Sequence, residues 1–202
     1  MKNLVLPSLA LLLLAGCSSE PAKPSAPVVK DPEFISGRTA FQKMYAAARG
    51  WHADAQVFRL TSALTKDSKG HDGKSAVWQA WFASASARSS KPYVWSGTNA
   101  SEGERGISWG GEDSYSPTNT STRAFDAAFL KSDSDVAFQV AQKHGGSKLL
   151  EKDPDQPAMY LLQWDAQDNA PAWHVLFGDG PRSYKLSVLV NASSGEYLRA
   201  EK

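Results

Sequence analysis

The first half of the chain passes from a helical to a strand-like pattern of hydrophobic positions. Residues 41–48 carry apolar side chains at helical spacing, and Gly50 follows where such a helix would end. Apolar and polar positions then alternate in two segments, 56–64 and 76–83, and the polar turn between them predicts a hairpin. A third, weaker strand is expected at 93–96.

The second half shows the same order of patterns. Val136, Val140 and Ala141 lie at helical spacing, Asp135 stands where it could cap this helix, and Gly145-Gly146 could end it. Alternating segments then predict a second set of strands. These segments are 158–164, 173–177, 184–190 and 196–200.

Three short stretches of the first half recur in the second half in the same order. Each match is weak alone, but their shared order favours duplication of one supersecondary unit. The matched pairs are 40–42 with 137–139, 76–82 with 171–177, and 99–104 with 191–196. The predicted fold class is α+β, built from two tandem units in which a helix covers an antiparallel β-meander.

The order of these elements, and the C-terminal run 188–197, resemble the PepSY family of small cystatin-like units. Such units carry an early Ala-rich helix and close with a hydrophobic strand, a turn of small residues and a Gly. The second copy resembles them best. The first copy departs from the pattern because Ser96-Gly97-Thr98 replaces the aliphatic run that forms this closing strand in the second copy. The resemblance implies contact with a peptidase, since PepSY units are associated with peptidase propeptides and proposed peptidase regulation.

The N-terminal segment combines Lys2 with about a dozen mostly aliphatic residues, a length typical of a signal sequence and too short to span a bilayer. It ends in Leu14-Ala15-Gly16-Cys17, which resembles the lipobox of bacterial lipoproteins. The resemblance implies cleavage before Cys17, lipidation of its sulfur and anchoring in the lipid bilayer. Ser18 and Ser19, with no Asp beside the cysteine, favour the outer membrane of the cell envelope by resemblance to Gram-negative sorting. The alternative is an ordinary secretion signal.

Proline and serine dominate the next segment, which predicts an extended tether rather than a folded element. The chain is thereby divided into five parts. These are a signal peptide (1–16), a lipidated Cys and Pro-rich tether (17–33), a first PepSY-like unit (34–104), a connecting segment (105–131) and a second PepSY-like unit (132–202).

Charge and motifs exclude several classes of function. Lys and Arg number 22 against 21 Asp and Glu, so no basic field exists to attract nucleic acid. Four histidines lack the spacing of metal ligands, and no phosphate-binding glycine motif or GxSxG nucleophile motif is present. We therefore predict no catalytic residue, no metal site and no cofactor.

The longest segment without periodicity, 103–119, is rich in Gly, Ser and acidic residues. A connecting loop is the favoured interpretation, and a contact loop is the second. The residues that would form a binding surface in the second case are Trp109, Glu112, Asp113 and Tyr115.

We expect a non-enzymatic envelope lipoprotein that presents sheet edges or this loop to a protein partner by β-augmentation, and the resemblance implies that this partner is a peptidase. The alternative is an envelope hydrolase or a carbohydrate-binding protein whose site joins Trp109, Glu112 and Asp113 with a histidine. A purely structural surface protein is a third interpretation.

Overall fold

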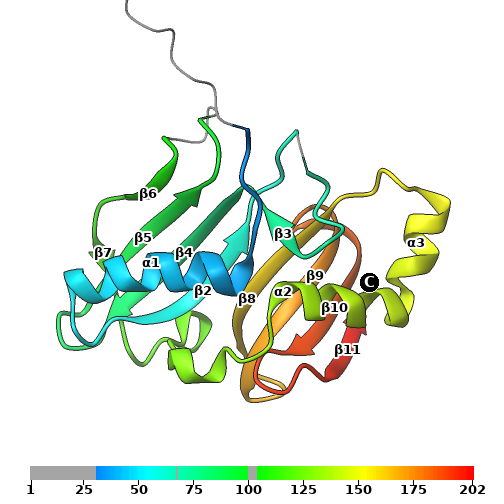
Figure 1. The fold of residues 1–202 in the computed structure, drawn as a ribbon. Coiled ribbons are helices and arrows are strands. Elements are labelled where there is room, and N and C mark those ends of the chain that lie inside the picture. The colour runs from blue at the N-terminus through cyan, green and yellow to red at the C-terminus, as the bar shows by residue number, and fades with distance from the viewer. Residues whose placement is uncertain (1–30, 67, 100–103) are drawn as a thin grey trace, which may run out of the picture.

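The computed structural model describes residues 31–66, 68–99 and 104–202, and this part of the chain is a mixed α/β fold with one long helix and a large antiparallel sheet (Figure 1). Nine of its strands form that sheet, in the order β11-β10-β9-β8-β2-β4-β5-β6, with β7 also paired to β5. Two further strands, β1 and β3, pair with each other. The signal sequence, Cys17 and the tether up to residue 30 lie outside the described residues.

The bounds of the elements follow the chain. The strands are β1 (Ile35–Ser36), β2 (Gln56–Ser62), β3 (Lys74–Ser75), β4 (Val77–Ser84), β5 (Ser89–Ser96), β6 (Gly106–Trp109), β7 (Asp113–Ser114), β8 (Ala158–Asp165), β9 (Ala170–Gly180), β10 (Ser183–Asn191) and β11 (Tyr197–Glu201). The α-helices are α1 (Gly37–Trp51), α2 (Ser134–Ala141) and α3 (Ser147–Lys152), with a π-helical turn at Gln142–Gly146 and 3-10 turns at Thr120–Thr122 and Ala127–Phe129.

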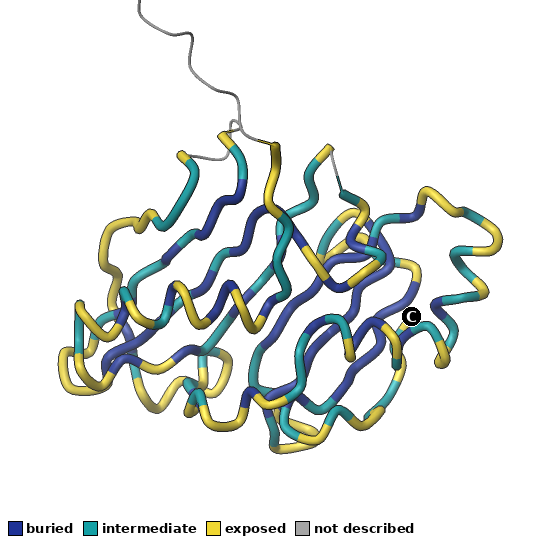
Figure 2. The backbone as a smooth tube through the Cα atoms, viewed as in Figure 1, coloured by how far each residue is buried: buried dark blue, intermediate teal, exposed yellow. Residues whose placement is uncertain are grey.

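The sheet consists of two halves that meet at the pairing of β2 with β8, where Leu60 lies opposite Leu162. Helix α1 packs on β2, β4 and β5, and α2 packs on β9 and β10, so both helices cover the same face of the sheet (Figure 1). The strands are mostly buried beneath them, while the outward sides of the helices are exposed (Figure 2). Within the described residues, no helix combines the length and hydropathy needed to cross a membrane.

The two halves make matching contacts. Trp78 Nε1 on β4 donates to the carbonyl of Ile35, two residues before α1, and Trp173 Nε1 on β9 donates to that of Ser132, two residues before α2, each at 3.0 Å. Both tryptophans are fully buried, and their rings meet edge to face with centroids 6.3 Å apart. Each indole therefore fixes the start of the helix in its own half while contacting the other indole.

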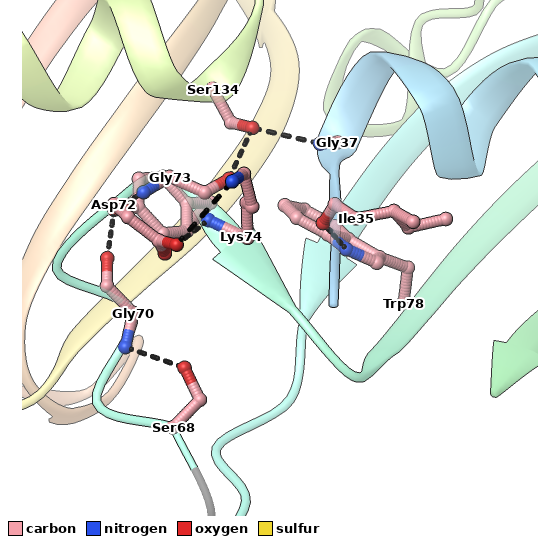
Figure 3. A network of polar contacts seen from close by, with 10 residues as sticks. Ile35, Gly37, Ser68, Gly70, Asp72, Gly73, Lys74, Trp78 and Ser134 are labelled. Atoms are coloured by element: carbon pink, nitrogen blue, oxygen red, sulfur yellow. Dashed lines mark hydrogen bonds and ion pairs between the residues drawn. The ribbon is translucent and has the colours of Figure 1, made fainter. Parts of the chain in front are cut away.

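The N-termini of α1 and α2 also meet, and one carboxylate serves both. Asp133 Oδ1 accepts from Ser134 N (2.7 Å) at the start of α2 and from Arg38 N (2.8 Å) in the first turn of α1. Ser134 Oγ accepts from Gly37 N (2.7 Å) and donates to the carbonyl of Gly73 (Figure 3). Because first-turn N–H groups have no partner inside their helix, these bonds supply acceptors to buried donors that would otherwise have none. The prediction that Asp135 caps this helix is wrong, because Asp133 is the N-cap and Asp135 lies inside the helix.

The loop between β2 and β3 closes against this junction through two glycines. Gly73 has φ of +78°, and a Cβ there would lie 2.3 Å from Asp135 Cα. The Tyr160 hydroxyl accepts from Gly73 N and donates to the carbonyl of Gly70, and burial raises the pKa of Tyr160, which keeps this donor proton in place. The loop is thus held by side chains of β8 and α2.

The predicted helix followed by antiparallel strands is confirmed as a mixed α/β arrangement. Three details differ from the expectation. Strand β5 begins at Ser89 rather than at Tyr93, and the second helix resumes as α3 beyond Gly145-Gly146. The expected connection, 105–131, contains β6 and β7, which extend the first half of the sheet.

Candidate binding site

The edge of the sheet at β6 and β7 is interrupted at a proline of the neighbouring strand. Gly110 N donates to the carbonyl of Pro92 (3.0 Å), but proline has no N–H to return. The edge strand leaves β5 at this point and rejoins it as β7. Residues 110–112 therefore bulge from the sheet, and a bulge at a sheet edge redirects the neighbouring side chains.

On the helix-covered side, a small pocket that we call the tryptophan pocket lies beside Trp109, the residue that precedes the bulge. It has a volume of about 380 Å³ and opens to the surface. The residues that line it are Ala47, Gly50, Trp51, Lys91, Tyr93 and Trp109. Trp109 is 62% exposed, and its ring centroid lies 6.3 Å from that of the buried Tyr93.

Glu112 joins this pocket through two polar contacts. Its Oε1 accepts a hydrogen bond from Trp51 Nε1 (2.8 Å) and lies 3.9 Å from Lys91 Nζ. The Lys91 ammonium also lies 5.8 Å from the centre of the Trp51 ring, within the range of a cation–π contact. The pKa of Tyr93 is raised by burial and then by the Glu112 carboxylate, so its hydroxyl stays protonated. The charged groups beside the pocket are therefore the Lys91 ammonium, a hydrogen-bond donor, and the Glu112 carboxylate, an acceptor, and their charges cancel.

The four residues predicted for the binding surface separate into two pairs. Trp109 lines the tryptophan pocket and Glu112 accepts a hydrogen bond from Trp51 of its lining, whereas Asp113 and Tyr115 line a second hollow on the opposite side of the sheet. Tyr115 is largely buried and stacks on Phe58, with centroids 5.9 Å apart. The Asp113 carboxylate accepts from Ser114 N (2.7 Å). The single contact surface envisaged from sequence therefore consists of two distinct hollows.

Reasoning from sequence missed Lys91 and Tyr93. They are two residues apart on β5 and so share one face, but only the pairing of Tyr93 with Trp109 shows that this face lies beside the bulge. An alternating Lys-x-Tyr next to an expected strand is too common a pattern to indicate a pocket.

Two other groups of titratable side chains lie within the second half of the sheet. The Arg199 guanidinium on β11 binds Asp165, Asp168 and Glu201, and its hydrogen bonds hold the pKa of Asp165 below the usual range. His174 is largely buried on the helix-free face of β9, which lowers its pKa. Within residues 31–66, 68–99 and 104–202, no three His, Cys, Asp or Glu side chains are grouped to hold a metal ion.

Comparison with known proteins gives a likeness of fold. No protein-family model matches the chain, and no curated protein matches it by sequence. The crystal structure of a "putative lipoprotein" from Clostridium difficile 630 superposes with a TM-score of 0.51 and 11% identity, covering 80% of this chain and 91% of that one. At this identity the likeness shows a shared fold alone.

Proposed function

We propose that this protein is a lipid-anchored lipoprotein of the bacterial envelope. The sequence Leu14-Ala15-Gly16-Cys17 supports cleavage before Cys17 and lipidation of its sulfur, and the absence of Asp beside the cysteine supports the outer membrane. The solved structure of similar fold is itself described as a "putative lipoprotein". In this proposal residues 17–33 link the lipid to the folded body, and the end of this segment already contacts the body, because Glu33 N donates to the carbonyl of Gly97 (3.0 Å) and Arg105 donates to that of Asp31 (2.6 Å).

We further propose that the body consists of two tandem PepSY-like units. The hydrogen bonds of Trp78 and Trp173 support this duplication, because equivalent strands donate to equivalent positions before each helix. A second match supports it too. Phe41 on α1 lies 6.0 Å from Phe82, and Phe138 on α2 lies 6.3 Å from Phe177, measured between ring centroids.

The body acts in this proposal as a non-enzymatic module that binds a protein partner along β6. The observation that carries it is the edge position of β6, which pairs with β5 and with no other strand of the described residues. Since Gly110 N faces β5, alternation along the strand turns the backbone groups of Ile107 and Trp109 away from it. An extended segment can add to such an edge through backbone hydrogen bonds. The resemblance to PepSY units points to an envelope peptidase as that partner.

Cross-linking in the envelope tests this proposal. A photo-reactive residue replacing Ser108, which is exposed on β6, is expected to give a discrete cross-linked product in living cells, identified by mass spectrometry as a peptidase. The matched control places the same residue at Gln42, exposed on α1, where no such product is expected. Equal products at both positions, or none at Ser108, would contradict binding along β6. A discrete partner that is not a peptidase would contradict only the peptidase assignment.

A further inference from the structure

The tryptophan pocket keeps a large apolar surface in contact with water. Trp109 is the most exposed of the large hydrophobic residues described, at 62%, and it stands beside the aromatic Tyr93 and Trp51. Its ring is tilted by 45° from that of Tyr93, so the indole face is not covered by stacking on its neighbour. Exposed aromatic surface of this kind, rimmed by polar groups, is typical of a ligand-binding site.

The polar rim decides what kind of ligand fits. A cationic ligand is disfavoured because the Lys91 ammonium already lies beside the Trp51 ring. An anionic ligand is also disfavoured. The Glu112 carboxylate is about half exposed and lies 3.9 Å from the Lys91 ammonium, so it would repel an anion that approached this ammonium. The pair offers a neutral ligand a charged donor and a charged acceptor side by side, and hydrogen bonds to charged groups are the stronger kind.

A sugar ring meets both requirements. The C–H groups on one face of a pyranose form an apolar surface that can lie on an indole, while adjacent hydroxyls can accept from an ammonium and donate to a carboxylate. The hydrogen bond from Trp51 Nε1 fixes the Glu112 carboxylate before any ligand arrives, which reduces the entropy lost on binding. The volume of about 380 Å³ suits one ring rather than a folded partner.

We propose that the tryptophan pocket binds one pyranose ring of a neutral glycan, stacked on Trp109 and hydrogen-bonded to Lys91 and Glu112. The sugar would contact the Trp109 side chain, whereas the partner proposed above would contact the backbone edge of β6, to which Trp109 also belongs. Cross-linking at Ser108 can therefore fail while sugar binding persists, and the reverse also holds.

Gly50 offers a way to block the pocket without disturbing the fold. It lines the pocket, and a Cβ at this position would meet no atom within 4 Å. Replacing a helical glycine also favours the helix. Gly50→Gln should therefore fill the pocket while leaving stability unchanged or slightly higher.

The test uses the full-length lipidated protein in a zwitterionic detergent that contains no sugar. Titration calorimetry and tryptophan fluorescence with chitotetraose and cellotetraose should give saturable binding to at least one of them. Trp109→Ala should weaken that binding at least tenfold, roughly 1.4 kcal/mol, and Gly50→Gln should weaken it comparably. The matched control Tyr197→Ala removes an exposed aromatic on β11 and should bind as the wild type does.

Three results would overturn the proposal. The first is the lack of a saturable signal with both oligosaccharides, and the second is wild-type affinity in Trp109→Ala. The third is saturable, Trp109-dependent binding of a Pro- and Trp-containing peptide in place of the sugars, which would assign the pocket to a peptide.

Discussion

Replacing Trp173 with alanine is expected to lower the free energy of unfolding by about 3–5 kcal/mol, the range for truncating a fully buried large aromatic side chain. The substitution opens a cavity beside Trp78 and also removes the hydrogen bond to the carbonyl of Ser132. Trp173→Phe keeps most of the ring but loses that bond and part of the packing, so an intermediate loss is expected. Urea unfolding followed by circular dichroism measures both.

Trp109→Ala is the matched control, because it removes the same side chain from a position that is 62% exposed. Its effect on stability should stay within about 0.5 kcal/mol, as for most surface substitutions. If Trp173→Ala were no more destabilising than Trp109→Ala, the buried contact of Trp173 with Trp78 and its bond to Ser132 would not stabilise the fold.

Asp133→Ala is expected to lower the free energy of unfolding by about 2–4 kcal/mol, because one substitution removes the caps of two helices. The carboxylate accepts from Ser134 N, Arg38 N and the Ser36 hydroxyl, and it also places negative charge at the positive ends of α1 and α2. Amide hydrogen exchange should accelerate at Arg38 and Ser134 together. Asp133→Asn, which keeps an acceptor but loses the charge, should cost less.

Asp135→Ala provides the control for this prediction. Asp135 lies two positions along the same helix, and its carboxylate accepts from the adjacent Val136 N (2.7 Å). Its removal should cost no more than about 0.5 kcal/mol. Equal losses from both substitutions, or faster exchange in α2 alone, would show that Asp133 does not join the two helices.

The sequence predicted the existence of β2, β4, β8, β9 and β10, because each of these strands carries a short run of apolar residues between polar turns. It did not predict the pairing of Leu60 with Leu162, since either half could have paired elsewhere. The sequence also did not show which of Asp133 and Asp135 caps α2. Both are good capping residues, and the proximity of Arg38 on α1, a tertiary feature, decides between them.

The candidate site was predicted in part. Trp109 and Glu112, two of the four residues expected from the sequence, lie at the candidate site, and Trp109 is 62% exposed. The separation of Glu112 from Asp113 follows from the bulge opposite Pro92, which depends on strand pairing rather than on local sequence. Lys91 and Tyr93 join the site only because α1 ends beside the bulge.

The most direct test of the central proposal, a lipid-anchored envelope protein, is the mass of the mature N-terminal fragment isolated from bacterial membranes. The account predicts a fragment that begins at Cys17 and carries diacylglycerol on its sulfur, together with loss of membrane attachment in Cys17→Ala. A fragment that begins elsewhere, or one that carries an unmodified Cys17 thiol, would contradict it.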